Sequence, residues 1–323
     1  MDLHGIDGGG RLVAVTGITG FIGGHLAGEL ARQGWRLRAL VRSMPRFSGV
    51  VGGAVEVVQG SLSDPKALQG LVAGADAVIH LAGSIKGLGR ADFMAANADG
   101  TAALASAWRA HAPDARFIHV SSMAAREPGL SHYAASKHAA EQRLGDVANG
   151  ANWCILRPAA VYGPGDRETL NIFRAATGPV QPMLNGGEAR VTVVHVGDLV
   201  RAIAALLGAE QLAACHEVTD ARHEGYSWDE LARATASAMG RTARPVRVPG
   251  IAVRALGMLG DVAALGDVAG MLTSQKAREI LHADWRSSLA SQPPTSLWQP
   301  EIDLEHGFAE AVAWYRATGW LPR

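Results

Sequence analysis

An α/β fold built on a doubly wound parallel sheet is predicted by three features of the sequence. The first is a strand, a glycine-rich turn and a helix in direct succession at residues 13–24 (VAVTGITGFIGG). The second is a series of short apolar runs, typical of buried strands, which alternate with helical patterns through the first half of the chain. The third is the polar side chains that directly follow these runs, where open α/β sheets bind their ligands.

The glycine-rich turn is the first candidate binding site. Gly17, Gly20 and Gly23 follow a strand that ends in Thr16, and an apolar helical pattern begins at Ile22. Glycines let the backbone approach a pyrophosphate closely, and the free N–H groups of a helix N-terminus attract its negative charge. The spacing therefore predicts a dinucleotide cofactor. Taken alone, it also fits a simple tight turn, so the later motifs decide between the two.

The end of the second expected strand, Arg36–Val41, bears on the choice of cofactor. An acidic residue here would bind the adenosine ribose and favour NAD, but this chain has Arg42. Because a guanidinium binds phosphate well, we expect NADP to be preferred, with NAD as the other possibility. The alternative is that Arg42 and Arg46 are ordinary surface charges.

The next two strands supply further cofactor contacts. Val55–Gln59 is followed by Ser61 and Leu62, which are placed to contact the adenine. Residues 77–81 run into HLAG (80–83), where small residues let the backbone pass under the cofactor. His80 is interpreted as a residue of the strand end, not as a base.

Two helices are expected beside these strands. Asp64 directly precedes Pro65, which predicts a side-chain N-cap with proline in the first turn. A longer helical pattern covers residues 90–111 and includes Asn97.

The candidate catalytic residues follow the fifth expected strand, Arg116–Val120, which delivers Ser121 and Ser122 at its carboxyl end. Tyr133 and Lys137 are four residues apart on a helical pattern that runs to about residue 149, so both side chains share one face. An ammonium beside a phenol stabilises the phenolate and makes the tyrosine a usable acid or base. Ser122 could bind the same substrate oxygen. The alternative is a chance Tyr-x-x-x-Lys spacing in an ordinary helix.

Seven motifs in order resemble the extended branch of the short-chain dehydrogenase/reductase superfamily, which includes epimerases and dehydratases. They are TGITGFIG (16–23), HLAG (80–83), NADGT (97–101), HVSS (119–122), YAASK (133–137), LRPAAVYGPGD (156–166) and VHVGDL (194–199). The resemblance implies a seven-stranded, doubly wound parallel Rossmann sheet with a smaller, mostly helical C-terminal substrate domain and a bound NAD(P). It also implies Tyr133 as the acid/base, Lys137 on the nicotinamide ribose, Ser122 on the substrate oxygen and Pro158 beside the nicotinamide.

The complete set of expected cofactor contacts combines the turn, the strand ends and the catalytic helix. It comprises Gly17, Thr19, Gly20, Phe21, Ile22, Gly23, Arg42, Ser61, Leu62, Leu81, Ala82, Gly83, Asn97, Tyr133, Lys137 and Pro158.

Three departures from the family pattern bear on the adenine contact and on the substrate. Ser61 stands where many relatives carry an aspartate for the adenine. The segment MAAREPG (123–129) replaces the VYG-type segment of nucleotide-sugar enzymes, so we expect an apolar pocket floor with Met123 as a substrate contact. Arg190 stands five residues before His195, whereas nucleotide-sugar epimerases tend to place an arginine four before. Arg190 is kept as a substrate-contact candidate, and a sugar diphosphate is not clearly expected. His195 and Asp198 are interpreted as a strand end and a helix cap.

The motifs divide the chain into a loose tail (1–10), a dinucleotide-binding domain (11–165, to which 191–215 returns) and a substrate-binding domain (166–190 and 216–323). Within the last, the apolar region 251–272 could line a pocket for an apolar substrate, pack on the core or form a dimer contact.

Composition narrows the class of function. The 30 basic and 30 acidic residues balance, which gives no broad attraction to nucleic acid or to an anionic membrane. Residues 246–272 are interrupted by charges, and the first ten residues lack the apolar core of a signal peptide, so we expect neither a membrane span nor a targeting signal. The two cysteines form no metal-binding pattern, and a cytoplasmic location is expected.

The sequence therefore predicts an NAD(P)-dependent oxidoreductase that interconverts a carbonyl and an alcohol on a small or moderately apolar substrate, on the side of the superfamily that resembles hydroxysteroid dehydrogenases and dihydroflavonol reductases. One alternative is a nucleotide-sugar epimerase or dehydratase. An alternative of another class is a non-catalytic dinucleotide-binding sensor or assembly protein. A homodimer is common in the family and is possible here.

Overall fold

The structure of the protein is a computed structural model that describes residues 10–43, 55–87, 89–178, 181–184, 189–209, 213–242, 245–264 and 272–322. Nearly all of the expected tail and Arg46 lie outside the described residues. The chain forms two compact units. The first comprises Met1–Pro158, Gly197–Val218 and Pro293–Gln299, and the second comprises Ala159–Val196, Thr219–Gln292 and Pro300–Arg323.

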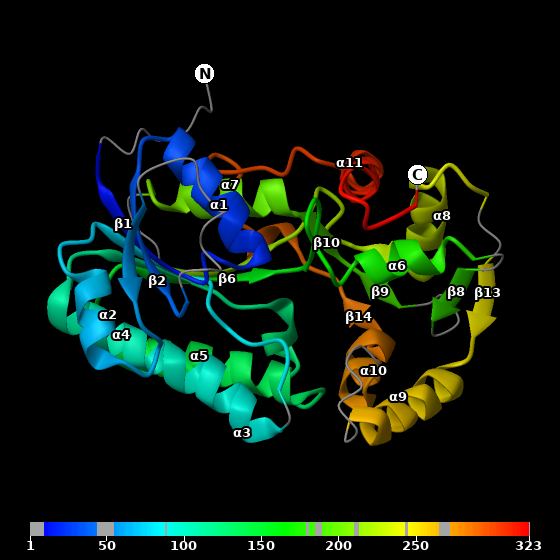
Figure 1. Cartoon of the computed structure of the whole chain (residues 1–323), viewed down its shortest axis with the longest axis horizontal. Coiled ribbons are helices and arrows are strands. Elements are labelled where there is room, and N and C mark those ends of the chain that lie inside the picture. Colours follow the sequence, from blue (N-terminus) through cyan, green and yellow to red (C-terminus); the bar gives the residue numbers. More distant parts are fainter. Residues whose placement is uncertain are drawn as a thin grey trace. The chain divides into compact units, whose positions relative to one another are not determined.

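The first unit is built on a seven-stranded parallel sheet (Figure 1). In spatial order its strands are β11 (Ala213–Val218), β6 (Trp153–Pro158), β5 (Arg116–Val120), β4 (Ala77–His80), β1 (Leu12–Thr16), β2 (Arg36–Val41) and β3 (Val55–Gln59). From β1 the chain first adds strands on one side and then, from β4 onward, on the other. The order therefore reverses between β1 and β4, and the carboxyl ends of these two strands form the crevice in which such sheets bind ligands. The predicted Rossmann sheet is confirmed.

Helices cover both faces of this sheet. Figure 1 shows α2 (Pro65–Val72), α4 (Gly100–His111) and α5 (His132–Val147) on one face, with α1 (Phe21–Arg32) and α7 (Val196–Leu206) on the other. Leucine and alanine side chains of α2 and α4 pack around the fully buried Trp108 and Phe117, whose ring centroids are 4.8 Å apart. The strands are buried on both sides, which explains why they are continuous apolar runs instead of alternating ones.

Local sequence signals set the ends of several helices. Asp64 caps α2 as predicted, because its carboxylate accepts hydrogen bonds from the backbone N–H groups of Lys66 and Ala67. The predicted helix at residues 90–111 is present, but it is not uniform. It consists of α3 (Arg90–Phe93), a π-helical segment (Met94–Asp99) and α4, so one wider turn interrupts it around Asn97.

The second unit has its own core and three small sheets. The sheets pair β7 (Ala160–Tyr162) with β10 (Val193–His195), β8 (Gln181–Leu184) with β13 (Pro245–Val248), and β9 (Arg190–Val191) with β12 (Tyr226–Ser227) and β14 (Asp284–Trp285). Its helices are α6 (Leu170–Ala175), α8 (Trp228–Ala238), α9 (Gly250–Ala264), α10 (Ser274–Leu281) and α11 (Leu304–Ala317). Aromatic rings fill the core, where Phe308 meets Tyr162 and Phe173 edge-on at centroid distances of 5.0 and 5.1 Å.

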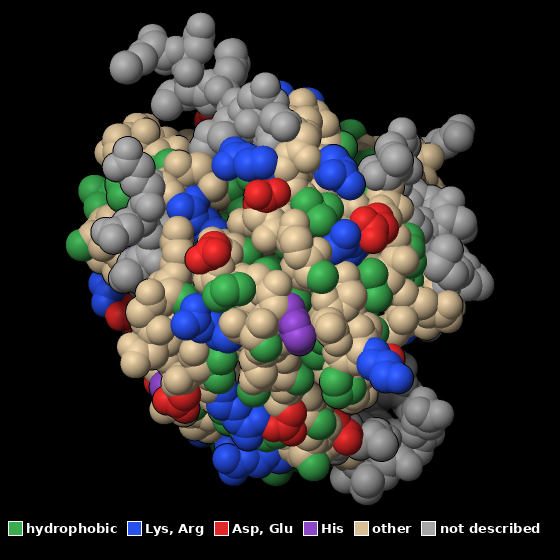
Figure 2. Space-filling model, turned by 90° about the vertical axis from the view of Figure 1, so that its left-hand side faces the viewer, with side chains coloured by type: hydrophobic (Ala, Val, Ile, Leu, Met, Phe, Trp, Pro, Cys, Tyr) green, Lys and Arg blue, Asp and Glu red, His purple; other side chains and the backbone are tan. Residues whose placement is uncertain are grey.

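Surface charge and hydropathy agree with the balanced composition. On the face shown in Figure 2, lysine and arginine side chains are interspersed with aspartate and glutamate. None of the helices in the described ranges is long and apolar enough to cross a bilayer. Cys154 is buried and Cys215 is exposed, and both are free thiols.

Candidate active site

The glycine-rich turn lies against the end of β4 at a distance that only glycine permits. Gly17 has a φ of +77°, and a Cβ atom placed on it would lie 2.7 Å from the backbone N of Ala82 and 2.8 Å from the carbonyl carbon of Leu81. A Cβ on Gly23 would lie 2.2 Å from the carbonyl oxygen of Gly17. Real Cβ atoms do not approach backbone this closely, so both positions require glycine. The turn is thereby folded tightly over the carboxyl edge of the sheet.

The helix that follows this turn has an open N-terminus. Its N-cap is Gly20, which has no side chain to accept from the first-turn N–H groups, and that turn contains no acidic residue. By contrast, α2, α5, α8, α10 and α11 are each capped by a side-chain oxygen. The first N–H groups of α1 therefore keep their capacity to bind an anion, and the positive end of the helix dipole points the same way. Both features fit a dinucleotide pyrophosphate.

A chain of hydrogen bonds joins β1, β4 and α4 directly beneath the turn. Thr16 Oγ1 accepts from the Ala82 N–H (3.2 Å) and lies 2.7 Å from His80 Nδ1, while His80 Nε2 lies 2.9 Å from Thr101 Oγ1. The Thr101 hydroxyl donates to the carbonyl of Asn97 (2.6 Å), so Nε2 is the protonated nitrogen and Nδ1 accepts from Thr16. Burial, and then the nearby Lys137, lower the pKa of His80 to about 3. His80 is thus a neutral structural residue, in agreement with its interpretation as part of the strand end.

The amide of Asn97 connects the loop after β4 to the helix that carries Tyr133. Its Oδ1 accepts from the Ser84 N–H (2.7 Å), and its Nδ2 donates to the Ser84 carbonyl (3.0 Å) and to Ser136 Oγ (2.8 Å). Ser136 in turn donates to the carbonyl of Tyr133 (2.7 Å). Asn97 is 1% exposed, and this fully satisfied amide fixes the position of the Tyr133 turn against the HLAG segment.

Tyr133 and Lys137 lie on the first two turns of α5, close to the end of β5. Ser131 caps this helix by accepting from the Ala134 N–H, and the half-buried Tyr133 ring packs edge-on near Phe93. The buried Lys137 ammonium donates to the carbonyl of Val120 (2.9 Å), two residues before Ser122. Ser122 Oγ accepts from the Ala124 N–H, which leaves its own proton to donate. The expected catalytic residues are therefore placed at one edge of one sheet.

A single buried carboxylate, that of Glu141, connects α5 to the ends of β5 and β6. It lies one turn after Lys137 on α5, accepts from Ser121 Oγ (2.5 Å) at the end of β5, and forms a two-pronged ion pair with Arg157 on β6 (2.9 and 2.5 Å). Glu141 is 7% exposed, so removing its partner would leave a buried charge at a cost of about 3 kcal/mol or more. Arg157 precedes Pro158 directly, so the same contact also fixes the end of β6.

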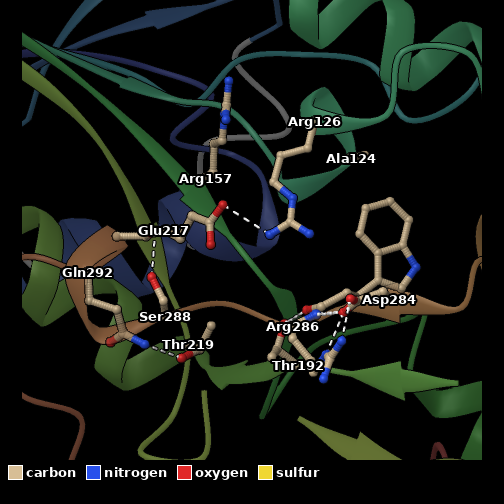
Figure 3. Close-up of polar contacts among 12 residues, drawn as sticks. Ala124, Arg126, Arg157, Thr192, Glu217, Thr219, Asp284, Arg286, Ser288 and Gln292 are labelled. Atoms are coloured by element: carbon tan, nitrogen blue, oxygen red, sulfur yellow. Dashed lines mark hydrogen bonds and ion pairs between the residues drawn. The ribbon is translucent and has the colours of Figure 1, made fainter. Parts of the chain in front are cut away.

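A second ion pair lies at the same end of the sheet. Arg126, in the short 3₁₀ turn after Ser122, pairs with Glu217 on β11 at 3.1 Å (Figure 3). This ion pair holds the segment 123–126 against β11, which is an edge strand of the sheet.

Burial sets the charge of the site. Desolvation lowers the pKa of Lys137 to about 8, and the negative charge of Glu141 opposes this fall. His119 stacks on His80 at 5.2 Å, and burial, Lys137 and His80 hold its pKa well below the usual value. Neither ring nitrogen of His119 has a hydrogen-bond partner among the described residues. Within this part of the sheet Lys137 is therefore a cation beside two neutral imidazoles.

The other expected cofactor contacts lie around the crevice. Arg42 is exposed directly after β2, where it has no ion pair with a described residue. Leu62 packs against Gly100, on which a Cβ would lie 2.7 Å from Leu62 Cδ1. Ser61 Oγ lies 2.9 Å from Ser63 Oγ. Thr19 is exposed, Phe21 and Ile22 are half-buried in the first turn of α1, and Pro158 is buried at the end of β6.

The two expected substrate contacts are placed differently. Met123 is 3% exposed. Arg190 belongs to the second unit, where its guanidinium pairs with Glu230 at 3.1 Å, and Glu230 also binds Arg222 and Ser227. The role of either residue toward a substrate remains a prediction.

Sequence reasoning missed Glu141 and Arg157. The available signal was the spacing of Glu141 four residues after Lys137, which places an acid on the face of α5 that carries Tyr133 and Lys137. No local pattern marks Arg157, because its partner is brought to it only by the folding of β6 beside β5.

The geometry defines a Rossmann-type dinucleotide-binding protein with a tyrosine–lysine pair at the carboxyl edge of its sheet. A model of the NAD dependent epimerase/dehydratase family matches residues 13–220, and the chain belongs to this family. It is an oxidoreductase of the short-chain dehydrogenase type. No cluster of His, Cys, Asp and Glu that could hold a metal ion occurs in the described ranges.

Similar proteins include two reductases. The chain is 43% identical over 314 residues to the ceramide reductase of Caulobacter vibrioides, covering 97% of this chain and 96% of that protein. It is 31% identical over 229 residues to the 2-alkyl-3-oxoalkanoate reductase of Stenotrophomonas maltophilia, covering 62% and 66%. Among solved structures, the UDP-glucuronic acid 4-epimerase of Bacillus cereus in complex with UDP-glucuronic acid and NAD has a TM-score of 0.72 at 16% identity and covers 95% and 100%. The last likeness shows the common fold.

Replacing Gly23 with alanine is predicted to open the glycine turn and to weaken NADPH and NADH binding by at least about tenfold, because the new Cβ meets the carbonyl of Gly17. Fluorescence titration with NADPH and with NADH measures the two dissociation constants. Gly28→Ala on the same helix is the matched control, since a Cβ at Gly28 has no atom within 4 Å. Equal cofactor affinity of the Gly23→Ala variant and the wild type would show that this turn does not hold the pyrophosphate.

Proposed function

We propose that this protein uses NADPH to reduce the ketone of a ceramide-like lipid to the alcohol. The observation that carries the proposal is the similarity to a ceramide reductase at 43% identity over nearly the full length of both chains. That match includes the second unit, so the similarity extends beyond the first unit and its glycine-rich turn. A nucleotide-sugar substrate has weaker support, because the likeness to epimerase structures lies at the level of the fold.

The substrate class follows from what the two similar reductases have in common. One is named as a reductase of ceramide and the other as a reductase of a 2-alkyl-3-oxoalkanoate. We infer that the reacting carbonyl lies in a long alkyl chain and carries a substituent on the neighbouring carbon. Met123, Ala124 and Ala125 directly follow Ser122 and are buried and apolar, so this segment offers no polar side chain to a sugar diphosphate.

In the proposed mechanism, Ser122 and Tyr133 act on the carbonyl oxygen. The Ser122 hydroxyl donates a hydrogen bond that orients the carbonyl and stabilises the negative charge that develops on its oxygen. Tyr133 gives its phenolic proton to the same oxygen. The Lys137 ammonium makes this transfer easier, because a nearby positive charge stabilises the phenolate that remains. A reduced nicotinamide, when bound, supplies the hydride to the carbonyl carbon.

Glu141 acts through these groups as a positioning residue. It holds Ser121, and with it Ser122, through a hydrogen bond, and its charge keeps the Lys137 pKa from falling further. Removing the carboxylate charge while keeping the shape of the side chain would therefore lower the pKa of Lys137, and it would also leave Arg157 without its ion-pair partner.

The preference for NADP is proposed from the position of Arg42. Its exposed guanidinium follows the second strand of the sheet, at the place where related folds bind the adenosine ribose. A guanidinium there would bind a 2′-phosphate through paired hydrogen bonds. The two free cysteines also suit a reducing compartment, and a cytoplasmic location remains our expectation.

Tyr133→Phe is predicted to lower kcat for ketone reduction by about 100-fold or more, because the acid is lost while the ring is retained. Cofactor oxidation with a keto-ceramide substrate measures the rate. NADPH affinity and the melting temperature should stay close to those of the wild type. Unchanged turnover in a correctly folded variant would remove the catalytic role of Tyr133.

Arg42→Ala is predicted to weaken NADPH binding by about tenfold or more and to leave NADH binding nearly unchanged, because only NADPH carries the 2′-phosphate. The measurement is the dissociation constant of NADPH and of NADH, each for the wild type and for the variant. Arg36→Ala, at the other end of the same strand, is the control and should change neither constant. An equal loss for both cofactors would argue against 2′-phosphate recognition by Arg42.

The reductive kcat is predicted to fall as the pH rises through about 8, because Lys137 then loses its proton and the positive charge beside Tyr133. Glu141→Gln removes a charge that raises this pKa, so the alkaline limb of the pH–rate profile should move to lower pH. Glu217→Gln, which also breaks an arginine ion pair, should leave the limb in place. A limb that is identical in all three proteins would contradict the assignment to Lys137.

A further inference from the structure

The helix α9 presents large apolar side chains to the outside of the second unit. Ile251 is 79% exposed, Leu259 62%, Met258 59% and Leu256 53%. Ile251, Ala255 and Met258 follow one another at helical spacing, with Leu259 beside them, so the outward surface of the helix is apolar along its first three turns. We refer to Ile251, Leu256, Met258 and Leu259 as the α9 apolar face.

Packing on the other side of the helix keeps this face turned outward. Val253 is 1% exposed, and a Cβ on Gly257 would lie 2.9 Å from Ser274 Cα and 3.1 Å from Ala277 Cβ of α10. The Asp261 carboxylate accepts from the backbone N–H of Ser274 (3.0 Å) and from its hydroxyl. Rotating α9 to hide the apolar face would break this close contact with α10.

Two arginines accompany the apolar face. Arg254 lies three residues after Ile251 and four before Met258, on the edge of the same surface, and Arg247 lies on β13 just before the helix. Both are exposed, and neither guanidinium has an ion pair with a described residue. Against these two cations, the described part of α9 carries one carboxylate, that of Asp261, which accepts hydrogen bonds from Ser274. The local charge is therefore positive although the whole chain is neutral.

We propose that the α9 apolar face docks on the surface of an anionic lipid bilayer. Apolar side chains beside unpaired cations are the composition of helices that lie in a membrane interface, where the former enter the acyl boundary and the latter meet lipid phosphates. The proposal rests in part on the proposed function, since a ceramide-like substrate is itself a membrane lipid. Docking brings the second unit to the phase that holds that substrate.

A second copy of the chain fits this surface less well. A stable protein interface uses about 20–30 residues a side, whereas the apolar face is four large side chains of one helix. A symmetric interface through this face would also bring Arg254 of both copies into one patch, and like charges repel.

The test is co-sedimentation of the full-length protein with vesicles of phosphatidylcholine and phosphatidylglycerol. The wild type should bind, and the double variant Ile251→Glu/Met258→Glu should lose at least about tenfold in vesicle affinity. Arg247→Glu/Arg254→Glu should lose binding to these vesicles, and the loss should grow as the phosphatidylglycerol fraction rises. Leu289→Glu, at an apolar residue of the same unit that is 66% exposed, is the matched control and should bind like the wild type.

Other outcomes overturn the proposal. Vesicle binding that is equal in the wild type and the Ile251→Glu/Met258→Glu variant would do so. So would a wild-type dimer in light scattering that the same variant converts to a monomer without changing vesicle binding.

A water-soluble short-chain keto-amide tests the chemistry separately. Loss of vesicle binding with unchanged turnover of this substrate supports docking, whereas vesicle binding without any ketone reduction would refute the proposed function and leave the docking surface standing.

Discussion

The contact between Gly17 and the backbone of Leu81 and Ala82 is the constraint on which the first unit depends. It joins the ends of the two strands at which the sheet order reverses, and it leaves no space for a side chain. Because Gly23 packs on the carbonyl of Gly17, the start of α1 follows the same constraint. A bare helix N-terminus is thereby directed over the sheet edge, and the polar chain from Thr16 through His80 to Thr101 supports it from below. The expected site for the pyrophosphate is in this sense a product of backbone packing.

Charge organises the part of the site that carries the proposed catalytic residues. The carboxylate of Glu141 binds Ser121, directly after β5, and Arg157 of β6, and Glu141 lies on the same helix as Tyr133 and Lys137. Buried ion pairs are costly to form, and such a pair is most useful where groups from different elements must keep a fixed geometry. As a consequence, the pKa of Lys137, and with it the charge of this residue, depends on burial and on the charge of Glu141.

The sequence allowed most of the first unit to be predicted, since its strands are continuous apolar runs and closely spaced glycines mark the turn between β1 and α1. The cap of α2 by Asp64 and the sharing of one helix by Tyr133 and Lys137 also follow from local rules. No local signal predicts the π-helical turn at Met94–Asp99, within which Asn97 binds Ser84 and Ser136, both distant in sequence. The same holds for Arg157 and for the pairing of Arg190 with Glu230, which bring together residues far apart in the sequence. No local motif identifies the substrate either.

The stacked pair of His80 and His119 has a consequence for how the protein senses its surroundings. Two histidines beside a reactive lysine suggest a group that responds to mild acid, yet both rings are buried and remain uncharged far below neutrality. Because both pKa values are lowered by burial, neither ring changes its charge when the medium acidifies moderately. Any response of this protein to mild acid must therefore come from titratable groups other than these two histidines.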